Sequence, residues 1–167
     1  MNDGFRIIPR ALPSGLLDSL RERFSPTGAS GLGGLRNALD VDEVLEAAQA
    51  MRPLAAQLHG ASAGSMTCVR GIVFDKTPAA NWKVAWHQDR SIAVERRHEV
   101  PGFGPWSIKG GVQHVQPAVG VLERMLTLRL HLDPCGEGNG PLRVIPASHC
   151  LGILNDSQIR EVRAQHP

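Results

Sequence analysis

Residues 82–89 read Trp-Lys-Val-Ala-Trp-His-Gln-Asp, and the interpretation of the rest of the chain depends on this stretch. His87 and Asp89 are two positions apart, so in an extended segment their side chains project to the same face. One imidazole and one carboxylate supply two of the three ligands of the 2-His-1-carboxylate triad, which leaves open positions on Fe(II) for oxygen and a cosubstrate. The stretch therefore predicts half of an iron site.

The same pattern occurs a second time, at His131 and Asp133. With seven histidines in 167 residues, a chance His-x-Asp is an alternative for either pair. Residues 125–133 alternate leucines with polar side chains, which predicts a strand with one apolar and one polar face. The regularity of this alternation favours His131 as part of the polar face, which turns either toward a cavity or toward solvent.

The composition fits one globular domain with a core of its own. The chain has 167 residues, of which 42% are hydrophobic, and this fraction is far above that of disordered proteins. A net charge of +2 is too small to indicate a nucleic-acid partner. Residues 96–98, Arg-Arg-His, form a basic cluster without interleaved aromatic residues, so we predict a solvated surface loop there.

The cysteines and the first residues indicate the cellular compartment. Cys68, Cys135 and Cys150 are odd in number and contain no CxxC, which favours buried reduced thiols over disulfides or a zinc site. Residues 1–10 contain no hydrophobic leader, and no apolar run approaches the length of a membrane span. We therefore expect a soluble, cytoplasmic protein without a membrane partner.

The first 64 residues carry two helix patterns. Ser14 stands near the N-cap of a short amphipathic helix, and Asp40 with Glu43 forms a capping-box-like start for a second one. Pro53 should kink the second helix or begin a new one, and Gly60 should end it. The Gly- and Ser-rich residues 26–37 predict a flexible loop.

Beyond Gly64 the pattern changes to short strands. Strands are predicted at residues 66–74, 84–89, 112–116, 125–133 and 142–146. Residues 99–111, rich in Gly and Pro, predict a long irregular loop of the kind that often carries function and substrate choice. Helices followed by many short strands indicate an α+β fold whose strands form a sandwich or a barrel.

Three runs of sequence carry a resemblance to a known family. They are Phe-Asp-Lys-Thr-Pro at 74–78, Trp-His-Gln-Asp at 86–89, and Asn-Gly-Pro-Leu-Arg-Val-Ile-Pro-Ala-Ser-His at 139–149. Together they resemble the phytanoyl-CoA dioxygenase family of Fe(II)- and 2-oxoglutarate-dependent oxygenases, and the last run is the most specific. The matches span about residues 72–154, with Ala147 where the family usually has Gly and Cys150 where Arg is common.

The resemblance implies N-terminal helices packed on a double-stranded β-helix, a jelly-roll or cupin-like barrel. It also implies that Fe(II), O₂ and 2-oxoglutarate, which is decarboxylated to succinate, serve to hydroxylate a small organic substrate. His87 and Asp89 match the first two iron ligands of the family, whereas His131 and Asp133 fall in the following core strand. Asp89 points to hydroxylation, because similar halogenases have a small residue at that position.

Other positions take their expected roles from the same resemblance. Lys76 and Ile72 match a strand that lies beside 2-oxoglutarate, although Lys76 could equally be a surface lysine. Arg129 would reach the cofactor if the polar face of its strand turns inward. Trp86 and His114 are the candidates on the substrate side, but Trp86 more readily supports the ligand strand and His114 more readily serves as a structural histidine.

Two groups of the family pattern have no match. The third iron ligand is a distal His, and an Arg holds 2-oxoglutarate; both follow the Pro-x-Ser-His turn by several tens of residues, but only eighteen residues follow His149. We therefore expect a single domain, residues 1–167, that lacks its last barrel strands and has impaired turnover. Unpaired strand edges would favour self-association. The alternative function is a non-catalytic jelly-roll module, either a binding protein or a degenerate relative that retains only the shape of the family.

Overall fold

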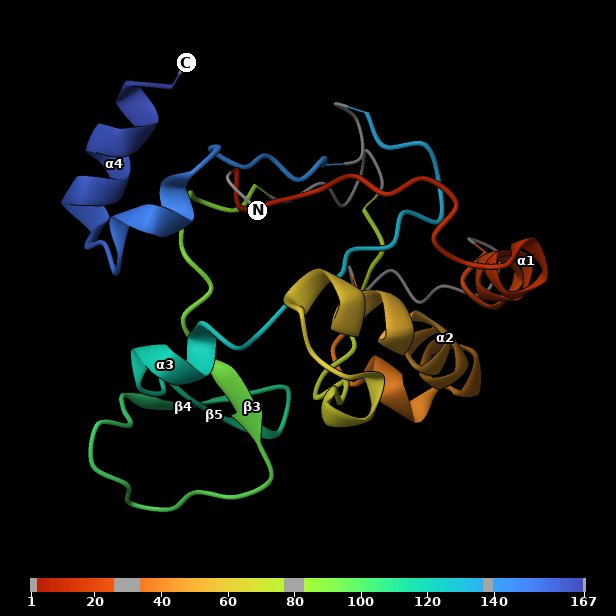
Figure 1. The fold of residues 1–167 in the computed structure, drawn as a ribbon, viewed down its shortest axis with the longest axis horizontal. Coiled ribbons are helices and arrows are strands. Elements are labelled where there is room, and N and C mark those ends of the chain that lie inside the picture. Colours follow the sequence, from red (N-terminus) through yellow and green to blue (C-terminus); the bar gives the residue numbers. More distant parts are fainter. Residues whose placement is uncertain (1–2, 26–33, 77–82, 137–139, 167) are drawn as a thin grey trace. The chain divides into compact units, whose positions relative to one another are not determined.

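The computed structural model describes residues 3–25, 34–76, 83–136 and 140–166 (Figure 1). The chain divides into two compact units. Unit 1 consists of Met1–Pro9, Lys76–Asp89 and Cys135–Pro167, and unit 2 consists of Arg10–Asp75 and Arg90–Pro134. Trp82 and residues 26–33 of the predicted Gly/Ser loop lie outside the described residues. Each unit combines segments that are far apart in the sequence.

Two helices build the core of unit 2. Helix α1 (Ser14–Arg23) and helix α2 (Asp42–His59) contribute to a hydrophobic cluster whose buried members are Leu12, Leu20 and Ala47. Half-buried side chains complete this helix cluster: Leu16, Phe24, Val44, Met51, Leu130 and Leu132. The apolar spacing that predicted the two helices is also what places these side chains on one side of each helix.

The ends of these helices follow the sequence only in part. Helix α2 ends at Gly60 as predicted, with a left-handed φ of 73° that glycine adopts without a Cβ clash. The predicted capping box is wrong, because Asp40 closes a short 3₁₀ turn, Val41 is the N-cap, and no side chain caps the helix. Ser14 begins α1 without a capping bond, and Pro53 lies inside α2, which continues past it.

Within its described residues, unit 2 also holds two small antiparallel sheets. Strand β1 (Gly34–Leu35) pairs with β2 (Val73–Phe74), and β3 (Ile92–Val94), β5 (Val112–Val115) and β4 (Trp106–Lys109) pair in that spatial order. Gly110 and Gly111, with φ of 59° and 78°, join β4 to β5 in a turn that requires positive φ. Strand β5 confirms the strand predicted at 112–116, but β4 lies inside 99–111, where the irregular loop was predicted.

Residues 125–133 follow the short helix α3 (Val119–Leu122) and form no hydrogen-bonded strand, although the sequence predicted one. The alternation nevertheless holds for burial: the four leucines of this segment are half-buried, and Thr127, Arg129, His131 and Asp133 between them are exposed. Leu130 and Leu132 pack against the helix cluster. The alternation of apolar and polar residues therefore predicted correctly which side chains face the core. It did not predict whether the backbone pairs with a neighbouring strand.

The helices and antiparallel sheets confirm the α+β character of the chain. Within the described residues the sheets have two and three strands and none closes into a barrel. The strand predicted at 66–74 is reduced to β2, and those predicted at 84–89 and 142–146 are not paired as strands. An apolar run gives a segment a buried side, but a strand exists only where a neighbouring backbone supplies hydrogen bonds.

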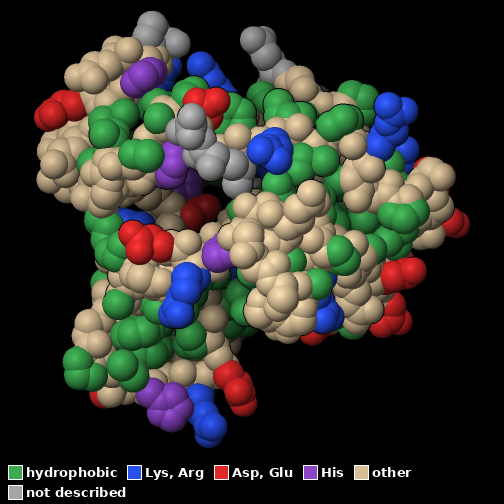
Figure 2. Space-filling view, viewed as in Figure 1, with side chains coloured by type: hydrophobic (Ala, Val, Ile, Leu, Met, Phe, Trp, Pro, Cys, Tyr) green, Lys and Arg blue, Asp and Glu red, His purple; other side chains and the backbone are tan. Residues whose placement is uncertain are grey.

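The described residues of unit 1 form one longer helix and very little core. Helix α4 (Asp156–Ala164) follows the 3₁₀ turn Ser148–Leu151 and begins with a capping box, in which Asn155 Oδ1 accepts from Gln158 N at 3.0 Å and Gln158 Oε1 accepts from Asn155 N at 2.9 Å. Among the described residues of this unit, Leu154 alone is buried. Large hydrophobic side chains of the unit are exposed at Phe5, Ile7, Val84, Leu142, Val144, Leu151 and Ile153. Figure 2, which draws both units together, shows apolar side chains at many places on the visible surface.

All three cysteines, Cys68, Cys135 and Cys150, are free and exposed, so the prediction of buried thiols is wrong. Cys135 and Cys150 belong to unit 1, where Leu154 is the buried residue among those described, and Cys68 lies outside the helix cluster of unit 2. The basic residues 96–98 are exposed, as predicted for a solvated loop. In the described part of the chain, no helix has the length and apolar character needed to span a membrane.

Candidate metal centre

His87 and Asp89 lie with their donor atoms facing each other. Nε2 of His87 is 3.5 Å from Oδ1 of Asp89. The other ring nitrogen of His87, Nδ1, lies 2.7 Å from the carbonyl oxygen of Ala85 and donates a hydrogen bond to it. A proton on Nδ1 leaves the lone pair of a neutral imidazole on Nε2, which is the state that a metal ligand needs. With the imidazole neutral, the pair presents one nitrogen lone pair and one carboxylate side by side.

The separation of these two atoms suits a shared ion. Two ligands placed about 2.1 Å from a divalent cation and at a right angle to each other lie about 3.0 Å apart. The observed 3.5 Å requires only a small closure. The side chains are 55% and 87% exposed, so an ion can reach them directly from solvent. Among the residues that the structure describes, no group of three His, Cys, Asp or Glu side chains could hold a metal, so this pair offers two ligands.

Gln88, between the two candidate ligands, is directed to the other side of the segment. Its Nε2 donates to the carbonyl oxygen of Gly152 at 2.8 Å, and its Oε1 accepts from the backbone N–H of Leu154 at 2.9 Å. Gln88 is half-buried, whereas His87 and Asp89 are exposed. No role for Gln88 was predicted from the sequence, although the period of two that joins His87 to Asp89 also turns the residue between them the opposite way.

The comparison with known families decides what kind of protein carries this pair. The family model described as phytanoyl-CoA dioxygenase (PhyH) matches residues 2–161 of the 167-residue chain. The chain belongs to the phytanoyl-CoA dioxygenase family. Members of this family are generally Fe(II)- and 2-oxoglutarate-dependent dioxygenases, so membership indicates an oxygenase-like function. No curated protein and no solved structure gave a match to the chain.

Trp86 precedes the candidate ligands of this family member and contacts two arginines. The guanidinium carbons of Arg143 and Arg163 lie 5.8 and 5.2 Å from the ring centroid, within the range of cation–π attraction. Arg163 belongs to helix α4, so the half-buried indole links the ligand segment to the C-terminal part of unit 1. This position favours a supporting role for Trp86 over a contact with substrate.

The positions that the resemblance assigns to 2-oxoglutarate are divided between the two units. Lys76 is half-buried and belongs to unit 1, as do His87 and Asp89. Ile72, half-buried just before β2, and Arg129, exposed on the polar side of residues 125–133, belong to unit 2. His87 and Asp89 are thus the predicted site residues that the structure brings together.

His114 is completely buried in strand β5 of unit 2. Its Nδ1 donates to the carbonyl oxygen of Val112 at 2.9 Å, while Nε2 has no hydrogen-bond partner within the described residues. Burial lowers the pKa of His114 below its ordinary value of 6.5; the bond to Val112 opposes this, and the charges of Arg70, Lys109 and Arg36 add to it. A neutral, enclosed imidazole favours a structural histidine over a contact with substrate.

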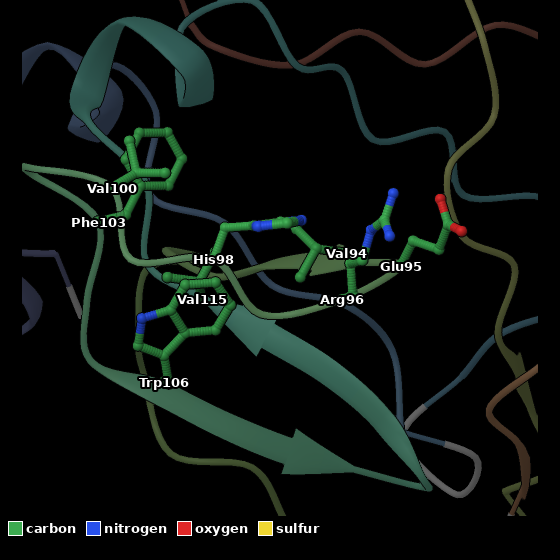
Figure 3. A pocket seen from close by; sticks show the side chains of 8 residues that line it. All are labelled: Val94, Glu95, Arg96, His98, Val100, Phe103, Trp106 and Val115. Atoms are coloured by element: carbon green, nitrogen blue, oxygen red, sulfur yellow. The ribbon is translucent and has the colours of Figure 1, made fainter.

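A hollow of about 300 Å³ opens on unit 2 beside the three-stranded sheet (Figure 3). It is lined by Val94, Glu95, Arg96, His98, Val100, Phe103, Trp106 and Val115. In Figure 3, Val100 and Phe103 stand at one end and Glu95 and Arg96 at the other. Several of the apolar walls come from residues 99–111, the segment expected to carry substrate choice.

Proposed function

We propose that His87 and Asp89 are ligands to Fe(II) in a 2-oxoglutarate-dependent oxygenase that hydroxylates a small organic substrate. Family membership supports the chemistry, and one observation carries the site: Nε2 of His87 lies 3.5 Å from Oδ1 of Asp89 while Nδ1 is bonded to Ala85. Bound Fe(II) would supply, with 2-oxoglutarate and O₂, the oxidising power for hydroxylation.

The two residues have different tasks in this proposal. The carbonyl of Ala85 holds the proton of His87 on Nδ1, which keeps the lone pair of Nε2 available to a cation. Asp89 adds a negative charge beside that lone pair and so strengthens the attraction for a divalent cation. Similar halogenases have a small residue at the position of Asp89, which makes room for a chloride ion. Because this chain has a carboxylate there, hydroxylation is the proposed reaction.

The remaining assignments follow the family pattern as proposals. Lys76, Ile72 and Arg129 are proposed to bind 2-oxoglutarate. For Trp86 and His114, the candidates on the substrate side, we propose structural roles instead, because Trp86 contacts Arg143 and the buried His114 bonds to Val112. The double-stranded β-helix of the family is the proposed framework, supported by the antiparallel pairing in both sheets of unit 2. Turnover should be low, because the described residues add no third side chain to the pair.

The proposal is tested by anaerobic titration of the chain with Fe(II) and 2-oxoglutarate, followed by the weak visible absorption of the Fe(II)–2-oxoglutarate complex. His87→Ala should raise the Kd for Fe(II) by more than about 100-fold, since a lost ligand costs more than the roughly 10–100-fold typical of an outer partner. His131→Ala, the matched control, should leave the titration unchanged. Equal iron binding by His87→Ala and the unaltered chain would refute the site.

Two observations favour a second candidate function, a non-catalytic binding module. His87 and Asp89 are 55% and 87% exposed, and the described residues provide no third metal ligand. Formation of succinate from 2-oxoglutarate, measured with Fe(II) and O₂, separates the two functions. Succinate above the level given by His87→Ala supports the enzyme, and equal iron content with equal succinate in both proteins supports the module.

A further inference from the structure

Gln88 bonds the ligand segment to a stretch of backbone that lies 64 and 66 residues further along the chain. Its Nε2 donates to the carbonyl oxygen of Gly152 at 2.8 Å, and its Oε1 accepts from the N–H of Leu154 at 2.9 Å. The carboxamide therefore uses one group as a donor and the other as an acceptor. Few side chains of this length could satisfy both backbone groups at once.

The two backbone partners have the spacing of a parallel β ladder. In such a ladder, one residue bonds to the carbonyl and the N–H of two residues that are two positions apart on the neighbouring strand. Gly152 and Leu154 are such a pair, and the carboxamide of Gln88 takes the place of a backbone peptide group. Leu154 is only 8% exposed, so its bond is sheltered from water. A side chain thus supplies the pairing that the backbone of residues 84–89 lacks.

These bonds restrict rotation of the segment about its own axis. Because Gln88 is held on the inner side, the residues before and after it are turned outward. Both His87 and Asp89 are exposed on that outer side, with their donor atoms 3.5 Å apart. Gln88 therefore acts on the pair through the backbone, with no need to contact either donor atom.

We propose that Gln88 is the positioning residue of the His87–Asp89 pair, and that its two hydrogen bonds to Gly152 and Leu154 hold both metal donors on one side. The inference rests on the proposed metal site and adds the side chain that prearranges its ligands. Metal affinity then depends on a residue that does not touch the metal, because a segment that is already ordered loses less conformational freedom on binding.

The test compares Gln88→Leu with Gln165→Leu, a change at an exposed glutamine of the same unit, in titrations with Co(II). The visible absorption of Co(II) reports the geometry of its ligands. Gln88→Leu should raise the Kd for Co(II) about tenfold or more and change the shape of the spectrum, and Gln165→Leu should do neither. Hydrogen exchange at the amide of Leu154 should also be faster in Gln88→Leu than in the unaltered chain.

A second variant keeps the test decisive if Gln88→Leu does not fold, as judged by circular dichroism. Gln88→Asn retains the carboxamide but is one methylene shorter, so it cannot reach both backbone partners, and its Kd should rise as well. Unchanged Kd and spectrum in a folded Gln88 variant, with binding lost in His87→Ala, would overturn the positioning role and leave the metal site in place. Unchanged binding in His87→Ala would refute the metal site, and the positioning role with it.

Discussion

The chain contains His-x-Asp twice, at residues 87–89 and 131–133, and the two copies are organised differently. In the first copy, Nε2 of His87 and Oδ1 of Asp89 are 3.5 Å apart. In the second copy, His131 and Asp133 are both exposed and, within the part of the chain that the structure describes, form no ion pair. Identical spacing in the sequence therefore does not produce identical geometry.

The residue between the two ends accounts for this difference. Gln88 is held by hydrogen bonds to Gly152 and Leu154, and its polar neighbours are oriented together on the other side. Leu132 instead packs on the helix cluster, and its carbonyl oxygen accepts a hydrogen bond from Nε of Arg21 at 2.6 Å. The middle residue of a His-x-Asp pattern is thus as informative as the histidine and the aspartate. A polar middle residue such as Gln88 indicates a polar site, whereas an apolar one such as Leu132 indicates a segment that packs on a hydrophobic core.

The largest expected effect separates the two copies by metal affinity. Asp89→Ala should weaken Fe(II) binding by more than about 100-fold, because the ion loses a charged ligand, and Asp133→Ala should leave the Kd unchanged. Anaerobic titration measures both. A similar loss of Fe(II) affinity in both variants would contradict this prediction, since it would mean that both His-x-Asp copies take part in binding.

A smaller effect is expected on the free energy of unfolding, for a substitution in the second His-x-Asp copy. Leu132→Ala should lower the free energy of unfolding by about 2 kcal/mol, because a half-buried side chain leaves the helix cluster. Leu142→Ala, at a leucine that is 59% exposed, should change it by less than about 0.5 kcal/mol. Urea unfolding followed by circular dichroism gives both values. Similar losses in the two variants would contradict the core assignment of Leu132.

The third test contrasts a buried histidine with the exposed histidine of the second copy. Burial lowers the pKa of His114 below 6.5, so below pH 6.5 the unfolded chain binds the proton more readily than the folded one. The contribution of neutral His114 to the free energy of unfolding should therefore be fully present above pH 6.5 and should fall as the pH drops toward the lowered pKa. For one proton, the slope of this decrease is at most about 1.4 kcal/mol per pH unit.

His114→Gln should flatten this pH dependence between pH 7 and pH 5, and His131→Gln, at an exposed site, should not. Urea unfolding midpoints of both variants and of the unaltered chain, measured across that pH range, test this prediction. An equally steep profile in His114→Gln would assign the pH dependence to other groups.

The smallest effect concerns the turn that leads toward the backbone partners of Gln88. Ala147 has a φ of 59°, in the left-handed region that costs a residue with a Cβ about 1 kcal/mol. The family resemblance places a glycine there. Ala147→Gly should therefore stabilise unit 1 by up to about 1 kcal/mol, measured as slower hydrogen exchange at Leu154. Faster exchange would show that the gain in chain flexibility outweighs the relief of strain.

Features that depend on neighbours along the chain could be predicted from the sequence. Both long helices of unit 2, the stop at Gly60 and strand β5 follow from the spacing of apolar residues and from the conformational freedom of glycine. The wrong predictions share another cause. Asp40 is used by a preceding 3₁₀ turn, and residues 125–133 find a hydrophobic cluster but no strand partner. Each of these outcomes depends on what else occupies the space around the segment.

By itself, the sequence determined the family, the main helices and the placement of a histidine and a carboxylate two residues apart. Only the tertiary structure decided which of the two His-x-Asp copies is organised. The reason is that the deciding contacts are distant in sequence: the partners of Gln88 lie 64 and 66 residues away, and Arg21 lies 111 residues from Leu132. Local spacing can turn two side chains to one side, but only a folded chain supplies the backbone that holds them there.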